Sequence, residues 1–424
     1  MKKVIIISYF YSPSNFVGAE RTKYWAENLY KSGVYPIIIT RNWNNGQKDI
    51  VDKVIENELR IEKNDNYEIH YLPYQQSFRD KLSEFPSLKM IQKFLSLMEL
   101  IFSNFLTSII PYSNFYKYIE KLISKDKDIK VLIASGRPFQ SFFFGYKLKK
   151  KFNYLNWIPD YRDEWNTHQN NHFQTGIFGK FLKSLERKSE RKWTSNATFF
   201  ISVSEYWVNS INKLINKPGI VIKNGYEKLN YLEDFTDKST LRILYAGTMY
   251  PSQDISIFIK SCKNLIESNS KLKLEVLFIG IEMVPEVLSN LKELTKNKEE
   301  NFFFYERMNK TQLDEEMKKA DLLLLTGFNE VKGWYPVKLF QYYSTGKPIL
   351  MIPSDNDVMQ DFLKGTNSGY FANSEVECLS VLNKLSELKV KGIDLRKEQN
   401  LEFGHHFSRE YQTKLLGEKL LQLK

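Results

Sequence analysis

Residues 333–350 read GWYPVKLFQYYSTGKPIL, and no other stretch says as much about the fold. The pattern predicts a glycine turn, a helix with Pro336 near its first turn, a glycine stop at Gly346 and an apolar strand. The first N–H groups of a helix lack partners within it and carry partial positive charge, so they attract anions. Lys338, one turn in, adds a full charge. We therefore expect this helix start to hold the diphosphate of an activated small molecule.

The same order of elements extends over the chain in both directions. Short Ile/Val/Leu runs alternate with longer mixed segments, which is typical of parallel strands covered by helices on both faces. The runs in the first half are 4–8, 36–40, 68–72, 131–134, 155–158 and 197–203. Those in the second half are 241–246, 272–279, 301–305, 321–325, 348–351 and 369–371. A turn at 224–226 and the polar stretch after it place a domain boundary between them.

We therefore predict an α/β protein of two Rossmann-like parallel-sheet domains, residues 1–225 and 226–406, because 424 residues exceed what one core holds. Ligands of open parallel sheets bind beyond the carboxyl ends of the strands, so the two domains are expected to face a central cleft.

Composition limits the partners. The formal charge of +11 calls for an anionic neighbour. No zinc-finger spacing, aromatic RNA-binding motif or basic heptad region occurs, so nucleic acid is not expected. Two distant cysteines suit a reducing compartment, and no run of apolar residues is long enough to span a bilayer. We expect a cytoplasmic protein that is soluble or peripheral to a membrane.

One region fits neither sheet. Residues 86–123 are rich in Leu, Ile, Phe and Tyr and carry lysines around them. Apolar side chains with basic flanks suit a segment that rests in a membrane interface or grips a lipid-linked molecule. A pair of core helices is the other interpretation, and the sequence leaves both open.

Candidate binding residues follow two strands of the first domain. Gly18 lies at a strand-to-helix turn, where a glycine lets a ligand approach the backbone, and Arg21 adds charge at the helix start. Ser135 and Arg137 follow the run 131–134, and Arg137 is placed to meet a phosphate. A plain structural turn remains the alternative at Gly18.

The segment WIPDYRDEW, residues 157–165, concentrates charge after another apolar run. Such charges are costly at a strand end unless they pair or act on a substrate. Arg162 is expected to orient one carboxylate, and Asp160 or Asp163 to accept a hydroxyl proton or contact a sugar. The alternative is a structural Arg–Asp clamp between the domains.

In the second domain, Gly247 and Thr248 follow the first strand. Gly247 permits close approach of a phosphate, and Thr248 donates from hydroxyl and backbone. The chain has neither the glycine fingerprint of dinucleotide-binding domains nor a P-loop, and its histidines show no zinc spacing.

Taken in order, these segments resemble the retaining glycosyltransferases of family 4, of the bacterial surface-polysaccharide type, which have the two-domain GT-B fold. The resemblance rests on the turn at Gly18 and on residues 135–141, 160–165, 202–205, 224–226, 245–248 and 338–350. It implies a nucleotide-sugar donor in the C-terminal domain, an acceptor in the N-terminal domain, and a C-terminal helix, residues 407–424, that returns to the first domain.

Carried over by position, the resemblance places Gly247 and Thr248 at the donor phosphates. Lys338, with the helix start Tyr335, Pro336 and Val337, cradles the nucleotide. The family carries two glutamates eight positions apart, where this chain has Gly333 and Gln341. Gln341 can still bind a ribose hydroxyl, whereas Glu330 is the residue expected to replace the missing carboxylate. The acceptor-binding residues implied by the resemblance are Gly18, Arg21, Ser135 and Arg137. The catalytic residues that it implies are Asp160, Arg162, Asp163 and Lys338.

The resemblance implies a UDP- or GDP-linked sugar as substrate, with no metal and no cofactor. The function predicted is sugar transfer to a glycan or lipid-linked glycan in capsule or O-antigen synthesis. The enzyme is expected at the inner face of the plasma membrane, in peripheral contact with anionic lipid. Two alternatives stay open: a degenerate sugar-nucleotide-binding scaffold, and a nucleotide-sugar 2-epimerase of the same fold.

Overall fold

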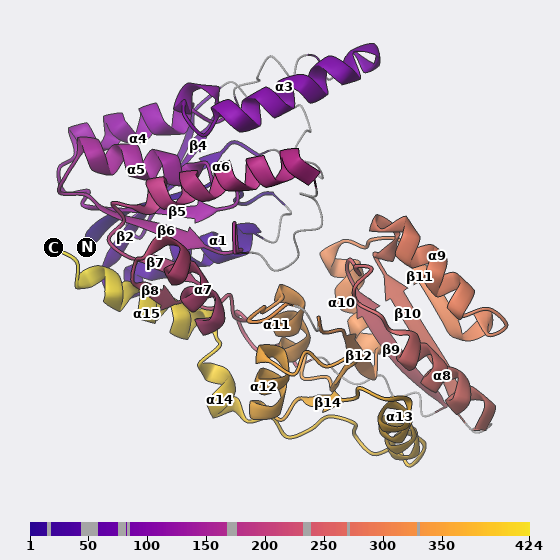
Figure 1. Ribbon diagram of the computed structural model, residues 1–424. Coiled ribbons are helices and arrows are strands. Elements are labelled where there is room, and N and C mark those ends of the chain that lie inside the picture. Colours follow the sequence, from indigo (N-terminus) through magenta and orange to yellow (C-terminus); the bar gives the residue numbers. More distant parts are fainter. Residues whose placement is uncertain are drawn as a thin grey trace. The chain divides into compact units, whose positions relative to one another are not determined.

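The computed structural model describes residues 1–14, 18–43, 58–74, 82, 85–167, 176–231, 239–268, 272–328 and 331–424. The chain divides into two compact units. Unit 1 comprises 1–224 and 409–424, and unit 2 comprises 225–408 (Figure 1). The boundaries predicted from sequence, at 225 and 407, differ from these by one and two residues.

Unit 1 is built on an eight-stranded sheet in the order β3-β4-β2-β1-β5-β6-β7-β8, with only β3 antiparallel among the described strands. Its strands are β1 (Lys2–Ser8), β2 (Val34–Arg41), β3 (Arg60–Lys63), β4 (Glu68–Leu72), β5 (Val131–Gly136), β6 (Asn156–Tyr161), β7 (Phe200–Ser202) and β8 (Gly219–Val221). All six strands predicted for this half are present. The sequence patterns missed β3 and β8, because β3 is exposed along its whole length and the three residues of β8 are only half-buried.

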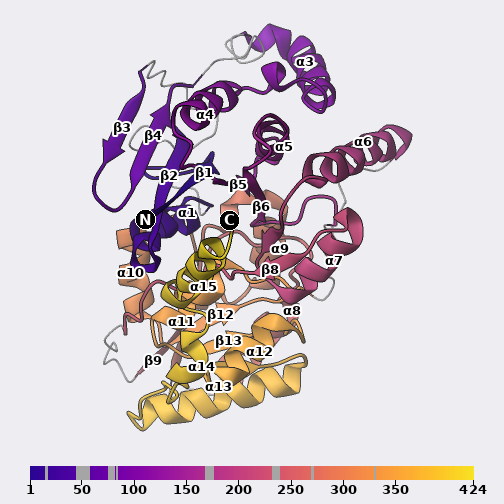
Figure 2. The same ribbon diagram turned by 90° about the vertical axis from the view of Figure 1, so that its left-hand side faces the viewer.

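Helices cover both faces of this sheet. On one face α1 (Gly18–Asn28) and α15 (Arg409–Leu421) pack through Trp25, Ala26, Leu416 and Leu420 onto the strands. Figures 1 and 2 show α4 (Asn114–Lys125), α5 (Ser141–Lys151) and α6 (Gly176–Thr194) on the other face, with α3 (Lys89–Phe102) at its outer side. Helix α7 (Glu205–Ile215) connects β7 to β8. The C-terminal helix therefore belongs to unit 1.

Unit 2 is a six-stranded, fully parallel sheet in the order β11-β10-β9-β12-β13-β14, which is the 3-2-1-4-5-6 order of dinucleotide-binding domains. The strands are β9 (Thr240–Ala246), β10 (Lys273–Ile279), β11 (Phe302–Tyr305), β12 (Leu322–Leu325), β13 (Ile349–Met351) and β14 (Gly369–Phe371). The helices are α8 (Ser256–Ser268), α9 (Pro285–Leu294), α10 (Lys310–Lys319), α11 (Val337–Ser344), α12 (Val358–Gly365), α13 (Glu375–Val390) and α14 (Leu401–His405). The prediction of two parallel α/β domains is confirmed.

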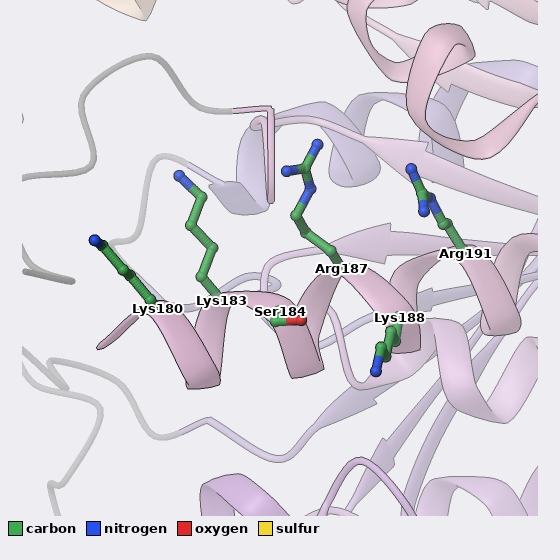
Figure 3. Close-up of a pocket in the computed structure, with 6 residues that line it drawn as sticks. All are labelled: Lys180, Lys183, Ser184, Arg187, Lys188 and Arg191. Carbon is green, nitrogen blue, oxygen red and sulfur yellow. The ribbon is translucent and has the colours of Figure 1, made fainter. Parts of the chain in front are cut away.

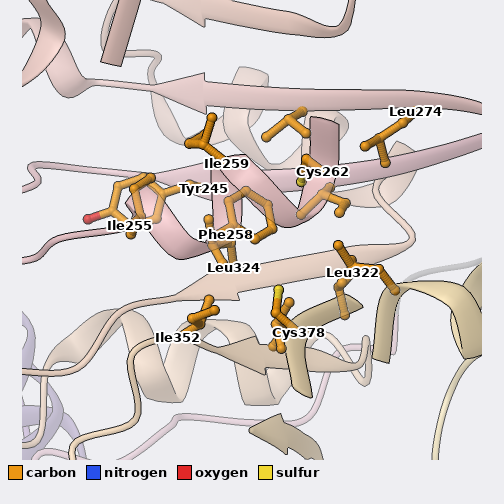
Figure 4. Packing of buried hydrophobic residues seen from close by; sticks show 14 of the residues in the cluster. Tyr245, Ile255, Phe258, Ile259, Cys262, Leu274, Leu322, Leu324, Ile352 and Cys378 are labelled. Atoms are coloured by element: carbon orange, nitrogen blue, oxygen red, sulfur yellow. The ribbon is translucent and has the colours of Figure 1, made fainter. Parts of the chain in front are cut away.

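Alternate residues of each central strand of unit 2 point to opposite faces. Leu322 and Leu324 of β12 face one core with α8, α9 and α13, whereas Leu323 and Leu325 face the other with α11 and α12. Figure 4 shows the first of these cores, in which the free cysteines Cys262 and Cys378 are both buried. Burial on both faces explains why these strands read as continuous apolar runs.

The segment 86–123 divides into two unlike halves. Helix α4 buries Phe115, Ile119 and Ile123 and is a core helix, whereas no described side chain of α3 is buried. None of the helices in the described ranges combines the length and apolar composition that a bilayer span requires.

Candidate functional site

The glycine turn of unit 2 lies at the carboxyl end of β9, where the strand order changes direction between β9 and β12. Gly247 has a φ of +100°, a backbone conformation that favours glycine, and its N–H donates to the carbonyl of Ile279 at 2.8 Å. A Cβ on Gly247 would lie 3.4 Å from Cε of Lys338. The structure therefore brings together two predicted donor residues that lie far apart in the sequence.

Helix α11 is fixed to β9 by a tyrosine one turn beyond the lysine. The hydroxyl of Tyr342 accepts a hydrogen bond from the backbone N–H of Ala246 at 2.8 Å. Leu339 and Phe340 anchor the same helix in the core, and Pro336 is its N-terminal cap residue. Because its φ is already −67°, Pro336 suits the helix start. The side chains of Lys338 and Tyr342 thus both reach from α11 to the strand end at the glycine turn.

Lys338 has no carboxylate partner among the residues that the structure describes. Its ammonium lies 3.7 Å from the centroid of the Tyr245 ring, which offers a negative π-face. Burial lowers the pKa of Lys338 to about 7, because a desolvated ammonium has lost water without gaining an anion. An anionic ligand at this place would supply the missing charge.

The other predicted donor residues differ in how far they are buried. The carbonyl of Thr248 accepts from the Tyr245 hydroxyl at 2.9 Å, which closes the glycine turn and leaves the Thr248 side chain half-buried. Tyr335 is buried against Phe340 and Phe407, Val337 is half-buried, and the Gln341 side chain is exposed on α11. Glu330 lies outside the described residues.

Gly333, where relatives of the predicted family carry a glutamate, has a φ of +73°. Its N–H donates to the Asp357 carboxylate at 2.5 Å. Tyr245 and Tyr342 were not among the residues predicted for the site. Their positions, two before the glycine and four after the lysine, were the available signal.

Three predicted residues of unit 1 also meet, but in a buried network. Asp160 is completely buried at the end of β6, and its two oxygens accept from Arg21 at 3.1 Å and from the hydroxyl of Ser135 at 2.8 Å. Arg21 also donates to the carbonyl oxygens of Ile222 and Lys223 at 2.8 and 3.1 Å. These contacts favour a structural role for Arg21, Ser135 and Asp160 over contact with an acceptor. The pair differs from the expected Arg–Asp clamp between the domains, because Arg21 of α1 and not Arg162 meets Asp160, within one unit.

The remaining predicted residues of unit 1 lie nearer the surface. A Cβ on Gly18 would overlap the guanidinium of Arg162, so the glycine is needed for this arginine to lie across the start of α1. Arg162 also donates to Asp163 at 3.3 Å, and Asp163 is partly exposed. Arg137 is exposed, with its guanidinium 6.0 Å from the Phe139 ring. Arg137, Arg162 and Asp163 are therefore the predicted residues of this unit that a ligand can reach.

The described residues contain no group of three His, Cys, Asp or Glu side chains placed to hold a metal ion.

Comparison with known proteins now identifies the type of protein. Residues 233–385, a little over a third of the chain, match the family model described as glycosyl transferases group 1. No curated protein matches the sequence.

Solved structures share the fold over the whole length. Sucrose-phosphate synthase from Thermosynechococcus elongatus has a TM-score of 0.65 at 12% identity, covering 100% of this chain and 99% of its own. An α,α-trehalose-phosphate synthase (UDP-forming) from Burkholderia xenovorans, in complex with glucose-6-phosphate, has a TM-score of 0.62 at 8% sequence identity. The match covers 99% of this chain and 100% of the synthase chain. Anabaena HepE, in complex with UDP and glucose, has a TM-score of 0.55 at 11% sequence identity, and the match covers 100% of both chains. Residues 233–385 thus form a glycosyl transferases group 1 domain within a chain of GT-B fold, and the protein is a glycosyltransferase.

Proposed function

We propose that the protein is a retaining glycosyltransferase that moves a sugar from a UDP- or GDP-linked donor to a glycan or lipid-linked glycan of a bacterial surface polysaccharide. The observation that carries this proposal is the contact between Gly247 and Lys338 at the switch point of the parallel sheet. A half-buried lysine without an ion-pair partner among the described residues, beside a helix start and a glycine turn, suits a diphosphate.

The chemistry of the site follows from charge. Transfer breaks the bond between the sugar and the diphosphate, so negative charge grows on the leaving oxygen. Lys338 and the N–H groups at the start of α11 are positioned to stabilise that charge in a partly desolvated place, where such interactions are strong. In this proposal no metal and no cofactor takes part. The exposed Gln341 side chain binds a ribose hydroxyl.

Structural neighbours support UDP-sugars as the first donors to test, since HepE is in complex with UDP and the trehalose-phosphate synthase is UDP-forming. On the acceptor side we assign contact to Arg137, Arg162 and Asp163, which ligands can reach, and assign Arg21, Ser135 and Asp160 to holding the strand ends. We also propose that the enzyme works at the cytoplasmic face of the plasma membrane, in peripheral contact with anionic lipid.

A second candidate is a sugar-nucleotide-binding subunit without turnover. Gly333 favours it, because this backbone position carries no carboxylate and its N–H already bonds Asp357. The two candidates share the donor site and differ in whether the bound donor is cleaved.

One experiment in two steps tests both. Thermal unfolding is measured with UDP-, GDP-, ADP- and CMP-sugars, because a ligand that binds only the folded state raises the midpoint. Release of free sugar from the best donor, without acceptor, is then measured. A raised midpoint with slow hydrolysis supports the enzyme, and a raised midpoint without hydrolysis supports the subunit. If no nucleotide-sugar raises the midpoint, both are wrong.

A further inference from the structure

Helix α6 carries a row of cations along one side. Lys180, Lys183, Arg187 and Arg191 follow one another at spacings of three, four and four residues, which places them on one face of a helix. Figure 3 shows these four side chains extending to the same side of the helix. Together with Ser184 and Lys188 they line a hollow. The charged ends of these side chains lie at the surface, so they take no part in packing the core.

The row borders a second hollow, between α6 and α7. Lys183, Arg187 and Arg191 line it together with Lys213 of α7 and the polar side chains Asn166, Thr167 and Ser210. Arg191 is held here, since its Nε donates to the carbonyl of Leu214 at 3.0 Å. No described carboxylate forms an ion pair with Lys180, Lys183 or Arg187. Glu186 and Glu190 lie between these cations in the sequence, and the charge of Arg187 acts on Glu190. The row still holds more cations than acids, and such an excess of positive charge attracts an external polyanion.

Apolar side chains are exposed in the same helical layer. At the start of α6, Ile177 is 91% exposed and Phe181 is 55% exposed. In and around α3, Met90 is 85% exposed and Phe94 60%. Further exposed apolar residues of this segment are Phe85, Ile91, Phe102, Phe105 and Leu106. Of the 24 large apolar side chains exposed in the described parts of the chain, seven thus lie between Phe85 and Leu106, far more than scattered surface residues require.

The two features lie on one face of unit 1. Figures 1 and 2 both place α3 and α6 on the face of the sheet that α4 and α5 cover, and α5 packs against α6. An apolar helix with basic neighbours is the composition that settles into the headgroup region of an anionic bilayer, where the apolar side chains enter and the cations meet phosphates. Nucleic acid would match the cations but leave the aliphatic side chains of α3 without a partner.

We propose that α3 and the cationic row of α6 form the surface by which this protein docks on a bilayer of anionic phospholipids. The inference deepens the proposed membrane contact by assigning it to residues, and it depends on the proposed function only for its location in the cell. Helix α3 provides insertion, and the row Lys180, Lys183, Arg187 and Arg191 provides attraction.

Vesicle sedimentation of the full-length protein tests the proposal. Vesicles are of phosphatidylcholine alone, or of equal parts phosphatidylcholine and phosphatidylglycerol. We expect binding to the anionic vesicles, weak binding to the neutral ones, and release at high salt. The variant Lys183→Gln/Arg187→Gln should lower the partition coefficient on anionic vesicles at least about tenfold, since each cation near such a surface contributes independently.

The apolar contribution is tested by Met90→Ser/Phe94→Ser, which should lower binding by a similar factor. Two controls remove groups of the same kind from unit 2. Lys260→Gln/Lys292→Gln removes two exposed charges, and Val376→Ser removes one apolar side chain that is 80% exposed on α13. Both controls should bind as the unchanged protein does. Equal binding to both vesicle types, or equal losses in controls and test variants, would overturn the proposal, as would absence of binding. The nucleotide-sugar thermal shift, measured on the same preparations, reports separately on the donor site.

Discussion

Two polar clusters lie at strand ends in this molecule, one in each unit, and they differ in one respect. In unit 1 the cation Arg21 finds the carboxylate of Asp160 inside the same fold, and both are buried. In unit 2 the cation Lys338 finds only the face of Tyr245 among the described residues. A charge whose partner is built in stabilises the fold, whereas a charge without one is available to a ligand. The same sequence signal, a cation in the first turn of a helix, therefore precedes two different roles.

The largest expected effect is on stability in unit 1. Asp160→Ala leaves Arg21 buried without its anion and should lower the free energy of unfolding by about 3–5 kcal/mol. Tryptophan fluorescence in urea measures this, because six of the seven tryptophans belong to unit 1. Asp163→Ala, which removes a partly exposed carboxylate next along the chain, should cost less than about 1 kcal/mol. Intact stability with lost turnover in Asp160→Ala would restore the catalytic role predicted for that residue.

The second largest effect is expected on turnover, from a substitution in unit 2. Lys338→Ala should lower the rate of sugar release from the best donor more than about tenfold, which corresponds to more than about 1.4 kcal/mol of transition-state stabilisation. The fold should persist, because removing an ammonium without an ion-pair partner among the described residues strands no opposite charge. Lys364→Ala, an exposed lysine on the neighbouring helix α12, is the control. Unchanged kinetics in a folded Lys338→Ala protein would contradict the donor-site assignment.

A smaller effect separates backbone strain from the site itself. Gly247→Ala and Gly176→Ala both force alanine into a positive φ, at +100° and +85°, and each should lose about 1–2 kcal/mol of stability. Only at Gly247 does the new Cβ contact the lysine, whereas at Gly176 it would have no neighbour within 4 Å among the described residues. The nucleotide-sugar thermal shift should therefore shrink in Gly247→Ala and stay unchanged in Gly176→Ala. Equal shifts in both variants would mean that the donor does not approach this turn.

The smallest effect is a pH dependence. In the folded protein the pKa of Lys338 is about 7, below its ordinary value of 10.5, so the unfolded chain binds more protons between these values. The contribution of Lys338 to stability therefore rises as pH increases from about 7 to 10.5. A bound diphosphate favours the ammonium, so donor binding near pH 8 should take up protons. Calorimetry in buffers of different ionisation enthalpy measures this uptake, and Lys338→Met should remove it. Undiminished uptake in that variant would assign the titration to another group.

The fold was predictable because it depends on local patterns. Runs such as Ile5–Ile7 and Leu322–Leu325 are apolar at every position, since both faces of a parallel sheet are covered, and all twelve runs became strands. The exposed strand β3 carries no such pattern and was missed. Helix α3 shows the limit of the same reasoning, because its composition resembles that of the core helix α4, and only the structure shows that one is buried and the other is not.

By itself the sequence determined the two α/β domains, the helix start at Pro336, and the residue types available at each strand end. Hydrophobic periodicity and turn chemistry act between neighbours in the chain, so they can be read without coordinates. Tertiary structure decided which charges meet: Arg21 with Asp160 across 139 positions, and Lys338 with the turn at Gly247. Burial and partner together determine whether a charged group is structural or open to a ligand, and neither is a property of the local sequence.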